Sequence, residues 1–219
     1  MQILCRALLF DMDGVLVDST PAVARVWTIW ANKFGFDPAE VVRRAHGRPS
    51  IATIRELLPD GDHHAEDQEI EKAEIEDVGD ITALPGAARL LAALPDAHHA
   101  VVTSATYALA VVRLLAAGFR IPKHLVTASD IKRGKPDPEP YLRGAQSLGF
   151  SSADCIVIED APAGIQSGKA AGSRVIALRT TAADPTLRES GADWIVNDCS
   201  AISLAFDPAN GTLVLTLPG

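Results

Sequence analysis

The fold of this chain is decided at residues 8–15, LLFDMDGV, where an apolar run stops at two carboxylates and a glycine. The run Leu4–Phe10 is almost entirely apolar, which is typical of a strand buried on both faces of a parallel sheet. Asp11 and Asp13 would then lie at the carboxyl edge of that sheet, where α/β folds bind ligands. The pattern D-x-D-G also occurs in calcium loops and plain turns, so the rest of the chain must support this interpretation.

Further buried strands are predicted along the chain. Short apolar runs alternate with helix-patterned stretches, at His99–Thr103, Cys155–Ile158, Arg174–Leu178 and Trp194–Val196. Runs of this kind, separated by crossover helices, predict an α/β fold with a doubly wound parallel sheet. Weak alternation from Ser203 to Leu217, around an Asn-Gly pair, predicts a terminal hairpin.

A long helical segment separates the first strand from the second. Residues 11–98 lie between them, far more than one crossover needs, and from residue 17 to 82 the periodicity is helical. Two apolar stripes stand at helical spacing there: Val23, Val26, Trp27, Trp30 and Phe34, and then Ile51, Ile54, Leu57 and Leu58. We therefore predict an all-helical cap domain at residues 17–82, inserted into an α/β core formed by residues 1–16 and 83–219.

The net charge argues against polyanionic partners and is concentrated in one segment. With 20 Lys and Arg against 28 Asp and Glu, the 219 residues carry −8, which leaves no basic field for nucleic acid or an anionic membrane. Asp60–Asp80 holds ten acids and one base, Lys72, so this segment carries −9 and the rest of the chain +1. Two interpretations stay open: the solvated outer face of a cap helix, or a docking surface for a basic partner.

The cysteines Cys5, Cys155 and Cys199 form no C-x-x-C pair, and their number is odd. This pattern favours small buried thiols in a reducing cytosol over a disulfide framework or a zinc site. The apolar run near the amino terminus is interrupted by Arg6 and Asp11, well short of the roughly 18 residues that a spanning helix needs. We expect a cytoplasmic monomer with no membrane or nucleic-acid partner.

Chemically active side chains follow the later strands as well. Ser104 ends the second strand, Lys135 stands just before a helix, and Glu159 and Asp160 close a third strand. Taken singly, these would be a helix cap, a surface lysine and a solvated turn. Hydroxyls and amides bind phosphate, and carboxylates bind hard cations, so successive strand ends that carry such groups predict one common site.

Three longer strings follow the first motif in order: TSAT (residues 103–106), GKPDPEPYL (134–142) and EDAPAGI (159–165). Together the four motifs resemble the haloacid dehalogenase superfamily of phosphohydrolases with a helical cap inserted after the first motif. They look closest to glycerol-3-phosphate and 2-deoxyglucose-6-phosphate phosphatases. The resemblance implies a magnesium-dependent phosphomonoester hydrolase that acts on a small sugar or polyol phosphate through an aspartyl-phosphate intermediate.

The resemblance also implies roles for the acidic residues. Asp11 would be the nucleophile that forms the aspartyl phosphate, and Asp13 the acid that protonates the leaving alcohol and then activates water. Mg²⁺ would be held by Asp11, the backbone carbonyl of Asp13 and Asp160, since a hard cation prefers oxygen ligands. Glu159 would support this site from behind rather than bind the ion itself.

The remaining motifs imply contacts with the substrate, a small phosphorylated metabolite. Ser104, the amide of Ala105 and Lys135 would hold the transferring phosphoryl oxygens, over which negative charge spreads in the transition state. Gly47 and Arg48 lie in a predicted cap loop that resembles the family's substrate-specificity loop. Arg48 would reach the substrate from there, or else be an ordinary surface arginine.

Other activities remain as alternatives, and a sugar phosphomutase of the same superfamily comes first. It would share all four motifs, but residues 21–24, PAVA, hold no counterpart of the cap-helix histidine expected in such mutases. A dehalogenase has no need of Asp13, and a phosphonate hydrolase would need a Schiff-base lysine, whereas Lys33 and Lys72 match no such motif. A receiver domain needs neither Asp13 nor a cap. A non-catalytic binding protein has no use for the complete set of site residues.

Overall fold

A six-stranded parallel sheet forms the centre of the protein, whose computed structural model describes residues 1–218. Its strands are β2 (Ala7–Phe10), β5 (His99–Val102), β6 (Leu125–Val126), β7 (Cys155–Glu159), β8 (Arg174–Leu178) and β9 (Trp194–Val196). They lie side by side in the order β6-β5-β2-β7-β8-β9, and neighbouring strands pair in parallel. From β2 the chain adds β5 and β6 on one side of the sheet and then β7, β8 and β9 on the other side. This arrangement confirms the predicted doubly wound α/β fold.

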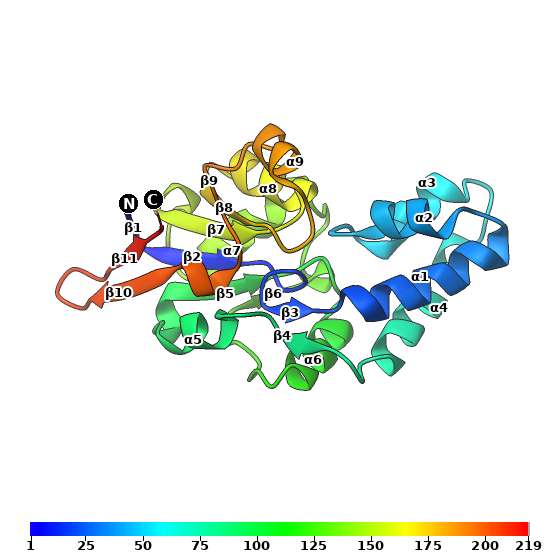
Figure 1. Cartoon of the computed structure of the whole chain (residues 1–219), viewed down its shortest axis with the longest axis horizontal. Coiled ribbons are helices and arrows are strands. Elements are labelled where there is room, and N and C mark those ends of the chain that lie inside the picture. The colour runs from blue at the N-terminus through cyan, green and yellow to red at the C-terminus, as the bar shows by residue number, and fades with distance from the viewer. Residues whose placement is uncertain (219) are drawn as a thin grey trace.

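Helices cover both faces of this sheet (Figure 1). On one face pack α5 (Ala87–Ala92) and α6 (Tyr107–Ala116), and on the other α7 (Glu139–Ser147), α8 (Pro162–Ala170) and α9 (Asp184–Glu189). Short 3₁₀ turns complete the connections at η1 (Asp96–His98), η2 (Ala128–Asp130), η3 (Ser152–Asp154) and η4 (Cys199–Ala201). This double cover explains why the central strands read as continuous apolar runs.

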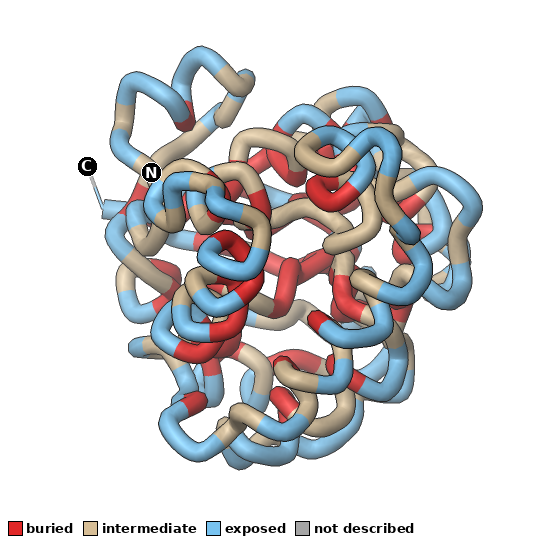
Figure 2. The backbone as a smooth tube through the Cα atoms, turned by 90° about the vertical axis from the view of Figure 1, so that its right-hand side faces the viewer, coloured by how far each residue is buried: buried red, intermediate tan, exposed pale blue. Residues whose placement is uncertain are grey.

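The side chains of β2 divide between two hydrophobic clusters, one on each face. Leu8 and Phe10 belong to the first cluster, and Ala7 and Leu9 to the second, as the two-residue repeat of a strand requires. Every residue of β2 and β7 is buried. In Figure 2 the buried backbone gathers in the interior of the molecule, behind exposed outer loops. The two strands that carry the acidic motifs are therefore fully enclosed in the sheet.

The prediction of a single first strand over Leu4–Phe10 is wrong, because the chain breaks at Arg6. The residues before the break form β1 (Gln2–Cys5), which leaves the parallel sheet and pairs antiparallel with β11 (Thr212–Thr216). β11 pairs in turn with β10 (Ser203–Asp207), so the predicted terminal hairpin is confirmed. Exposed and buried residues alternate along β1, and the exposed ones include the apolar Leu4. Because Leu4 is apolar although it is exposed, the sequence of β1 resembles that of a strand buried on both faces.

Between β2 and β5 the chain forms a helical insert, Thr20–Glu76, which lies at one end of the molecule in Figure 1. Its helices are α1 (Thr20–Phe34), α2 (Pro38–Ala45), α3 (Ser50–Leu57) and α4 (His63–Glu76). They enclose a hydrophobic cluster of their own, in which Trp30 lies edge-on to Trp27 with 5.5 Å between the ring centroids. The short strands β3 (Val17–Asp18) and β4 (Thr82–Ala83) pair where the chain leaves and returns. The domain boundary at residues 17–82 stays a prediction.

The acidic segment Asp60–Asp80 is only in part an outer face. Several of its acids form ion pairs with helix α1, Arg25 with Asp77 and Asp80, and Lys33 with Glu66 and Glu69. These pairs are at the surface, where solvent screens the charges and each pair contributes little to stability. Three further acids of α4 turn inward, toward the cavity described below. The interpretation of the whole segment as a solvated face is therefore wrong.

The cysteines are free and buried, as predicted from their number and spacing. Burial raises the pKa of the thiols of Cys5, Cys155 and Cys199 to about 12. They therefore stay protonated and act as small apolar side chains. Within residues 1–218, no helix combines the length and the hydropathy needed to cross a bilayer.

We expect Trp30→Ala to lower the free energy of unfolding by about 3–5 kcal/mol, because the cluster loses one of its two buried indole rings. Trp30 is 3% exposed, and its indole N–H donates to Glu66. The matched control is Ile29→Ala, the preceding position of the same helix, where the side chain is 72% exposed. It should change the stability by less than about 0.5 kcal/mol. Urea unfolding followed by circular dichroism measures both, and equal losses would contradict this packing.

Candidate active site

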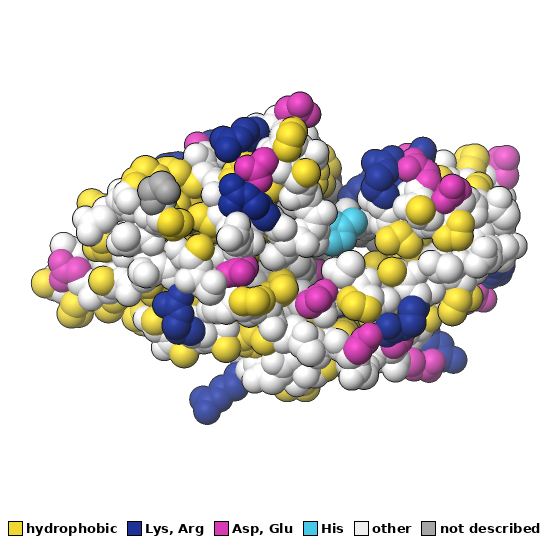
Figure 3. All heavy atoms as spheres, in the orientation of Figure 1, with side chains coloured by type: hydrophobic (Ala, Val, Ile, Leu, Met, Phe, Trp, Pro, Cys, Tyr) yellow, Lys and Arg dark blue, Asp and Glu magenta, His cyan; other side chains and the backbone are white. Residues whose placement is uncertain are grey.

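A cavity of about 130 Å³ lies between the carboxyl ends of β2 and β5 and the helical insert. Figure 3 shows the surface hollowed between these two parts of the molecule. This is the sheet edge at which the sequence predicts ligand binding. Of the predicted site residues, Asp11, Asp13, Gly47, Arg48, Ser104 and Ala105 line the cavity, and Lys135, Glu159 and Asp160 stand in a buried group around Asp11.

A buried lysine holds Asp11 in place. Lys135 Nζ donates to Asp11 Oδ1 at 2.7 Å and to Glu159 Oε1 at 2.8 Å, and no side chain of the three is more than 6% exposed. Asp11 follows β2 and Glu159 ends the neighbouring β7, so the pairing of these strands brings both carboxylates to one ammonium. Burial would lower the pKa of Lys135, but the two carboxylates raise it above its usual value. Lys135 therefore stays protonated.

Glu159 has all of its acceptor positions occupied by the protein. Its Oε1 accepts hydrogen bonds from Lys135 and from the Tyr141 hydroxyl at 3.0 Å, and its Oε2 accepts them from the amides of Asp160 and Ala161. Burial would raise the pKa of Glu159, but Lys135 and the two amides lower it below its usual value. A carboxylate bound in this way orients its neighbours and is poorly available to an ion, in agreement with its expected supporting position.

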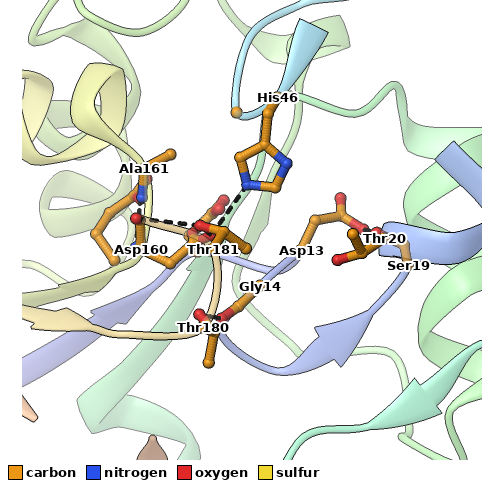
Figure 4. Close-up of polar contacts among 12 residues, drawn as sticks. Asp13, Gly14, Ser19, Thr20, His46, Asp160, Ala161, Thr180 and Thr181 are labelled. Carbon is orange, nitrogen blue, oxygen red and sulfur yellow. Dashed lines mark hydrogen bonds and ion pairs between the residues drawn. The ribbon is translucent and has the colours of Figure 1, made fainter. Parts of the chain in front are cut away.

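Asp160 has one carboxylate oxygen that is held and one that has no partner (Figure 4). Its Oδ2 accepts a hydrogen bond from Thr181 and lies 3.2 Å from His46 Nε2. Its Oδ1 is buried, and no group within residues 1–218 makes a hydrogen bond to it. Gly14, at φ +79°, passes so close that a Cβ would lie 2.1 Å from Oδ2. A buried acceptor left open in this way points to a ligand that fills it.

Sequence reasoning misses Thr181, and it places His46 in the cap loop with Gly47 and Arg48 without predicting its contact with Asp160. Thr181 comes shortly after β8 at the same edge of the sheet, so the strand-end argument could have found it. His46 stands in the loop between α2 and α3, next to Gly47. The resemblance places this loop near the substrate, but it does not predict the contact with Asp160, because that contact depends on how the insert packs against the core.

The buried carboxylates fit a divalent cation. Oxygens of Asp11, Glu159 and Asp160 lie within 4.8 Å of one another, and Lys135 contacts two of these residues. Three carboxylates against one ammonium leave two negative charges, which a buried site tolerates only when they are compensated. Burial raises the pKa of Asp11 and of Asp160 for the same reason. Since the carboxylates offer only oxygen atoms and Asp160 Oδ1 is open, the site suits a hard cation such as Mg²⁺.

Asp13 is fixed from two sides at the cavity wall. Its Oδ1 accepts a hydrogen bond from Ser19 Oγ at 2.5 Å, and its Oδ2 accepts one from Arg113 Nη1 at 3.0 Å. Arg113 comes from α6 and is 4% exposed, and its Nη2 lies 3.3 Å from Glu74 of α4. Sequence reasoning misses Arg113 as well. A signal was available, because this arginine is the only charged residue in α6.

The predicted phosphate-binding loop lies at the cavity but is engaged with protein groups. Ser104 Oγ donates to the carbonyl of Gly47 over a long 3.4 Å, and the amide of Ala105 donates to Thr103 Oγ1 at 3.1 Å. Both donors follow β5, beside Asp11 on β2. The hydroxyl contact is weak, so Ser104 is free to turn to a ligand, whereas the Ala105 amide would have to leave Thr103.

Gly47 and Arg48 bring the insert to the cavity in different ways. Gly47 has φ +70°, and a Cβ there would lie 2.5 Å from the Cβ of Ala161 in the core. Only glycine lets the loop come this close. Arg48 lines the cavity, but its Nη1 is paired with Glu56 of α3 at 3.0 Å. It is therefore neither a free surface arginine nor an unpaired cation pointing at the site.

Comparison with known proteins agrees with this geometry. The family model of haloacid dehalogenase-like hydrolases matches residues 5–172. Hexitol phosphatase A of Escherichia coli strain K12 is 42% identical over 216 residues, which cover 96% of this chain and 99% of that protein. Glycerol-1-phosphate phosphohydrolase 2 of Saccharomyces cerevisiae is 39% identical over 212 residues, or 90% of this chain and 84% of that protein.

A solved structure of β-phosphoglucomutase from Clostridium difficile has a TM-score of 0.78 at 22% identity, and covers 90% of this chain and 92% of that one. At this identity the likeness concerns the fold alone. The two curated relatives cover nearly the whole chain, and the family model spans all four motifs up to EDAPAGI. The chain belongs to the haloacid dehalogenase-like hydrolase family.

Proposed function

We propose that this protein is a magnesium-dependent phosphomonoester hydrolase that acts on a small sugar or polyol phosphate through an aspartyl phosphate at Asp11. The observation that carries the proposal is the position of Asp11, which faces the cavity while Lys135 holds it beside the open oxygen of Asp160. Similarity to a hexitol phosphatase and to a glycerol-1-phosphate phosphohydrolase supports this substrate class.

In the first step the Asp11 carboxylate forms a bond to phosphorus as the bond from phosphorus to the ester oxygen breaks. The leaving alkoxide takes a proton from Asp13, which Ser19 and Arg113 orient toward the cavity. Division of the displacement into two steps lowers the barrier of each, and proton transfer to the alkoxide makes it a better leaving group.

In the second step water attacks the phosphorus of the aspartyl phosphate. Asp13, now without its proton, takes one from that water, and the bond between Asp11 and phosphorus breaks. Inorganic phosphate leaves, and both aspartates return to their starting states. Lys135 keeps its positive charge throughout and opposes the negative charge on Asp11 and on the phosphoryl oxygens.

Mg²⁺ would be held by Asp11, the backbone carbonyl of Asp13 and Asp160. When bound, it would supply positive charge that reduces the repulsion between the carboxylate and the phosphate. Glu159 would keep Lys135 in position, because it accepts a hydrogen bond from the Lys135 ammonium. Thr181 would keep Asp160 in position, because its hydroxyl donates a hydrogen bond to the Asp160 carboxylate.

We also propose that residues 17–82 act as a cap. The cavity is enclosed by the insert on one side and by the sheet edge on the other, and the loop at Gly47 packs directly against Ala161. Such a lid would exclude water from the first step. The phosphomutase alternative has less support, since helix α1 contains no histidine and His46 contacts Asp160 rather than Asp13.

Asp11→Asn should reduce kcat for p-nitrophenyl phosphate by at least about 10³-fold, because the amide is a poor nucleophile. The melting temperature tests whether the fold is kept, since asparagine can still accept the hydrogen bond from Lys135. Asp37→Asn serves as the control, because Asp37 caps α2 away from the cavity and asparagine caps equally well. Turnover close to the wild-type rate in Asp11→Asn would contradict covalent catalysis at this residue.

Removal of divalent ions with EDTA should abolish turnover, and added Mg²⁺ should restore it. Asp160→Asn should raise the Mg²⁺ concentration that gives half-maximal activity by about 10–100-fold, because the open oxygen loses its charge. Thermal unfolding gives a readout independent of activity: Mg²⁺ should raise the melting temperature of the wild type and not that of Asp160→Asn. An identical response in both proteins would overturn the assignment of Asp160.

A further inference from the structure

Three carboxylates of α4 face the proposed active-site cavity. Asp67, Glu71 and Glu74 stand at i, i+4 and i+7, which places them on one side of the helix, and all three line the cavity. They belong to the acidic segment Asp60–Asp80, four of whose other acids pair with α1 at the surface. They face the same space as Asp11 and Asp13, from the insert rather than from the sheet.

Each carboxylate contacts a polar side chain through one of its oxygens. Asp67 Oδ1 accepts a hydrogen bond from Ser50, Glu71 Oε1 accepts one from Thr106, and Glu74 Oε2 lies 3.3 Å from Arg113 Nη2. Within residues 1–218, Asp67 Oδ2 and Glu71 Oε2 make no hydrogen bond or ion pair with another side chain or the backbone. A carboxylate accepts about four hydrogen bonds, so both have capacity left for a ligand.

An independent feature of the same wall also indicates a ligand. Arg113 is 4% exposed and lines the cavity, yet its Nε and Nη2 have no hydrogen-bond acceptor within residues 1–218. The approach of Nη2 to Glu74 is an ion pair without hydrogen-bond geometry. Buried guanidinium donors are rarely left open. The lining of the cavity therefore includes both donors and acceptors that the described residues leave unpaired.

Hydroxyl groups suit this combination, because each can donate one hydrogen bond and accept others. Trp27 also lines the cavity, and an aromatic ring suits the carbon-bound hydrogens between hydroxyls. A second anionic group is unsuited to it. Three carboxylates face the space, Arg113 is already shared between Asp13 and Glu74, and Arg48 is paired with Glu56.

We propose that Asp67, Glu71 and Glu74 form a polyol subsite that selects phosphate monoesters with an uncharged, hydroxyl-rich alcohol and rejects those with a second anionic group. The subsite would bind the part of the substrate that leaves as alcohol, while the phosphate lies at Asp11. This inference rests on the proposed phosphatase function and deepens it, since it assigns the choice of substrate to α4.

The test compares two substrates of matched length, glucitol 6-phosphate and 6-phosphogluconate, which differ in a terminal CH₂OH or carboxylate. The wild type should prefer the hexitol phosphate by at least about 100-fold in kcat/KM. Glu71→Gln and Asp67→Asn keep the size of the side chains but remove one charge each. Either should reduce this preference by about 10-fold or more, through poorer binding of the hexitol phosphate and better acceptance of the phosphogluconate.

Glu76→Gln is the matched control, because it makes the same change on the same helix at a side chain that is 68% exposed and outside the cavity. It should leave the preference unchanged. Turnover of p-nitrophenyl phosphate, whose alcohol part carries no further hydroxyl group, distinguishes a failure of the polyol subsite from a failure of the proposed phosphatase function. A wild type that hydrolyses p-nitrophenyl phosphate but does not distinguish the two six-carbon substrates overturns the subsite alone. So does a preference that survives in both cavity variants. A wild type that hydrolyses none of the three overturns the proposed function, and the subsite with it.

Discussion

The site depends on one ammonium group buried between two carboxylates. Lys135 lies 2.7 Å from Asp11 and 2.8 Å from Glu159, and loss of one partner from such a buried group costs about 3–5 kcal/mol. Glu159 is itself held by Tyr141 and by the two amides that follow β7. The end of β2, the end of β7 and the loop before α7 are therefore tied together, and this fixes the direction of the Asp11 carboxylate.

The single positive charge of Lys135 does not balance all of the buried carboxylates at this edge of the sheet. Asp160 joins Asp11 and Glu159 in the same buried group, and its Oδ1 is left open. A cation would complete the balance and satisfy that oxygen. His46 of the insert lies beside Asp160 and Gly47 packs against Ala161, so the insert reaches the buried carboxylates as well as the cavity.

The strand-end argument predicts Asp11, Glu159 and Asp160 from sequence because the carboxyl ends of parallel strands meet at one edge of the sheet. It does not predict Arg113, which reaches the site from a helix, where the register with the sheet is set by packing. The inward face of α4 is hidden for a related reason. Charged residues are spread around α4 so evenly that no apolar stripe marks its inner side. The number of acidic residues in the segment does not show which of them face solvent and which line a cavity.

The limits of local pattern also explain the errors in the strands. Leu4 is apolar yet exposed, which extends the apparent run across the break at Arg6. The edge strand β6 (Leu125–Val126) has only two residues, too few to give a periodic signal. Both errors lie at the margins of the core. The strands β2, β5 and β7 position the site, and they are predictable because each is buried on both faces and therefore appears in the sequence as a continuous apolar run.

The central claim is that the phosphoryl group passes through Asp11, and the direct measurement is mass spectrometry of the enzyme quenched with acid during turnover. Borohydride treatment converts an aspartyl phosphate to homoserine and so marks the residue that carried it. The account predicts a phosphoryl group, and after reduction homoserine, at position 11 and at no other aspartate. Phosphoryl transfer to a different residue, or steady turnover in which Asp11 is never modified, would contradict it.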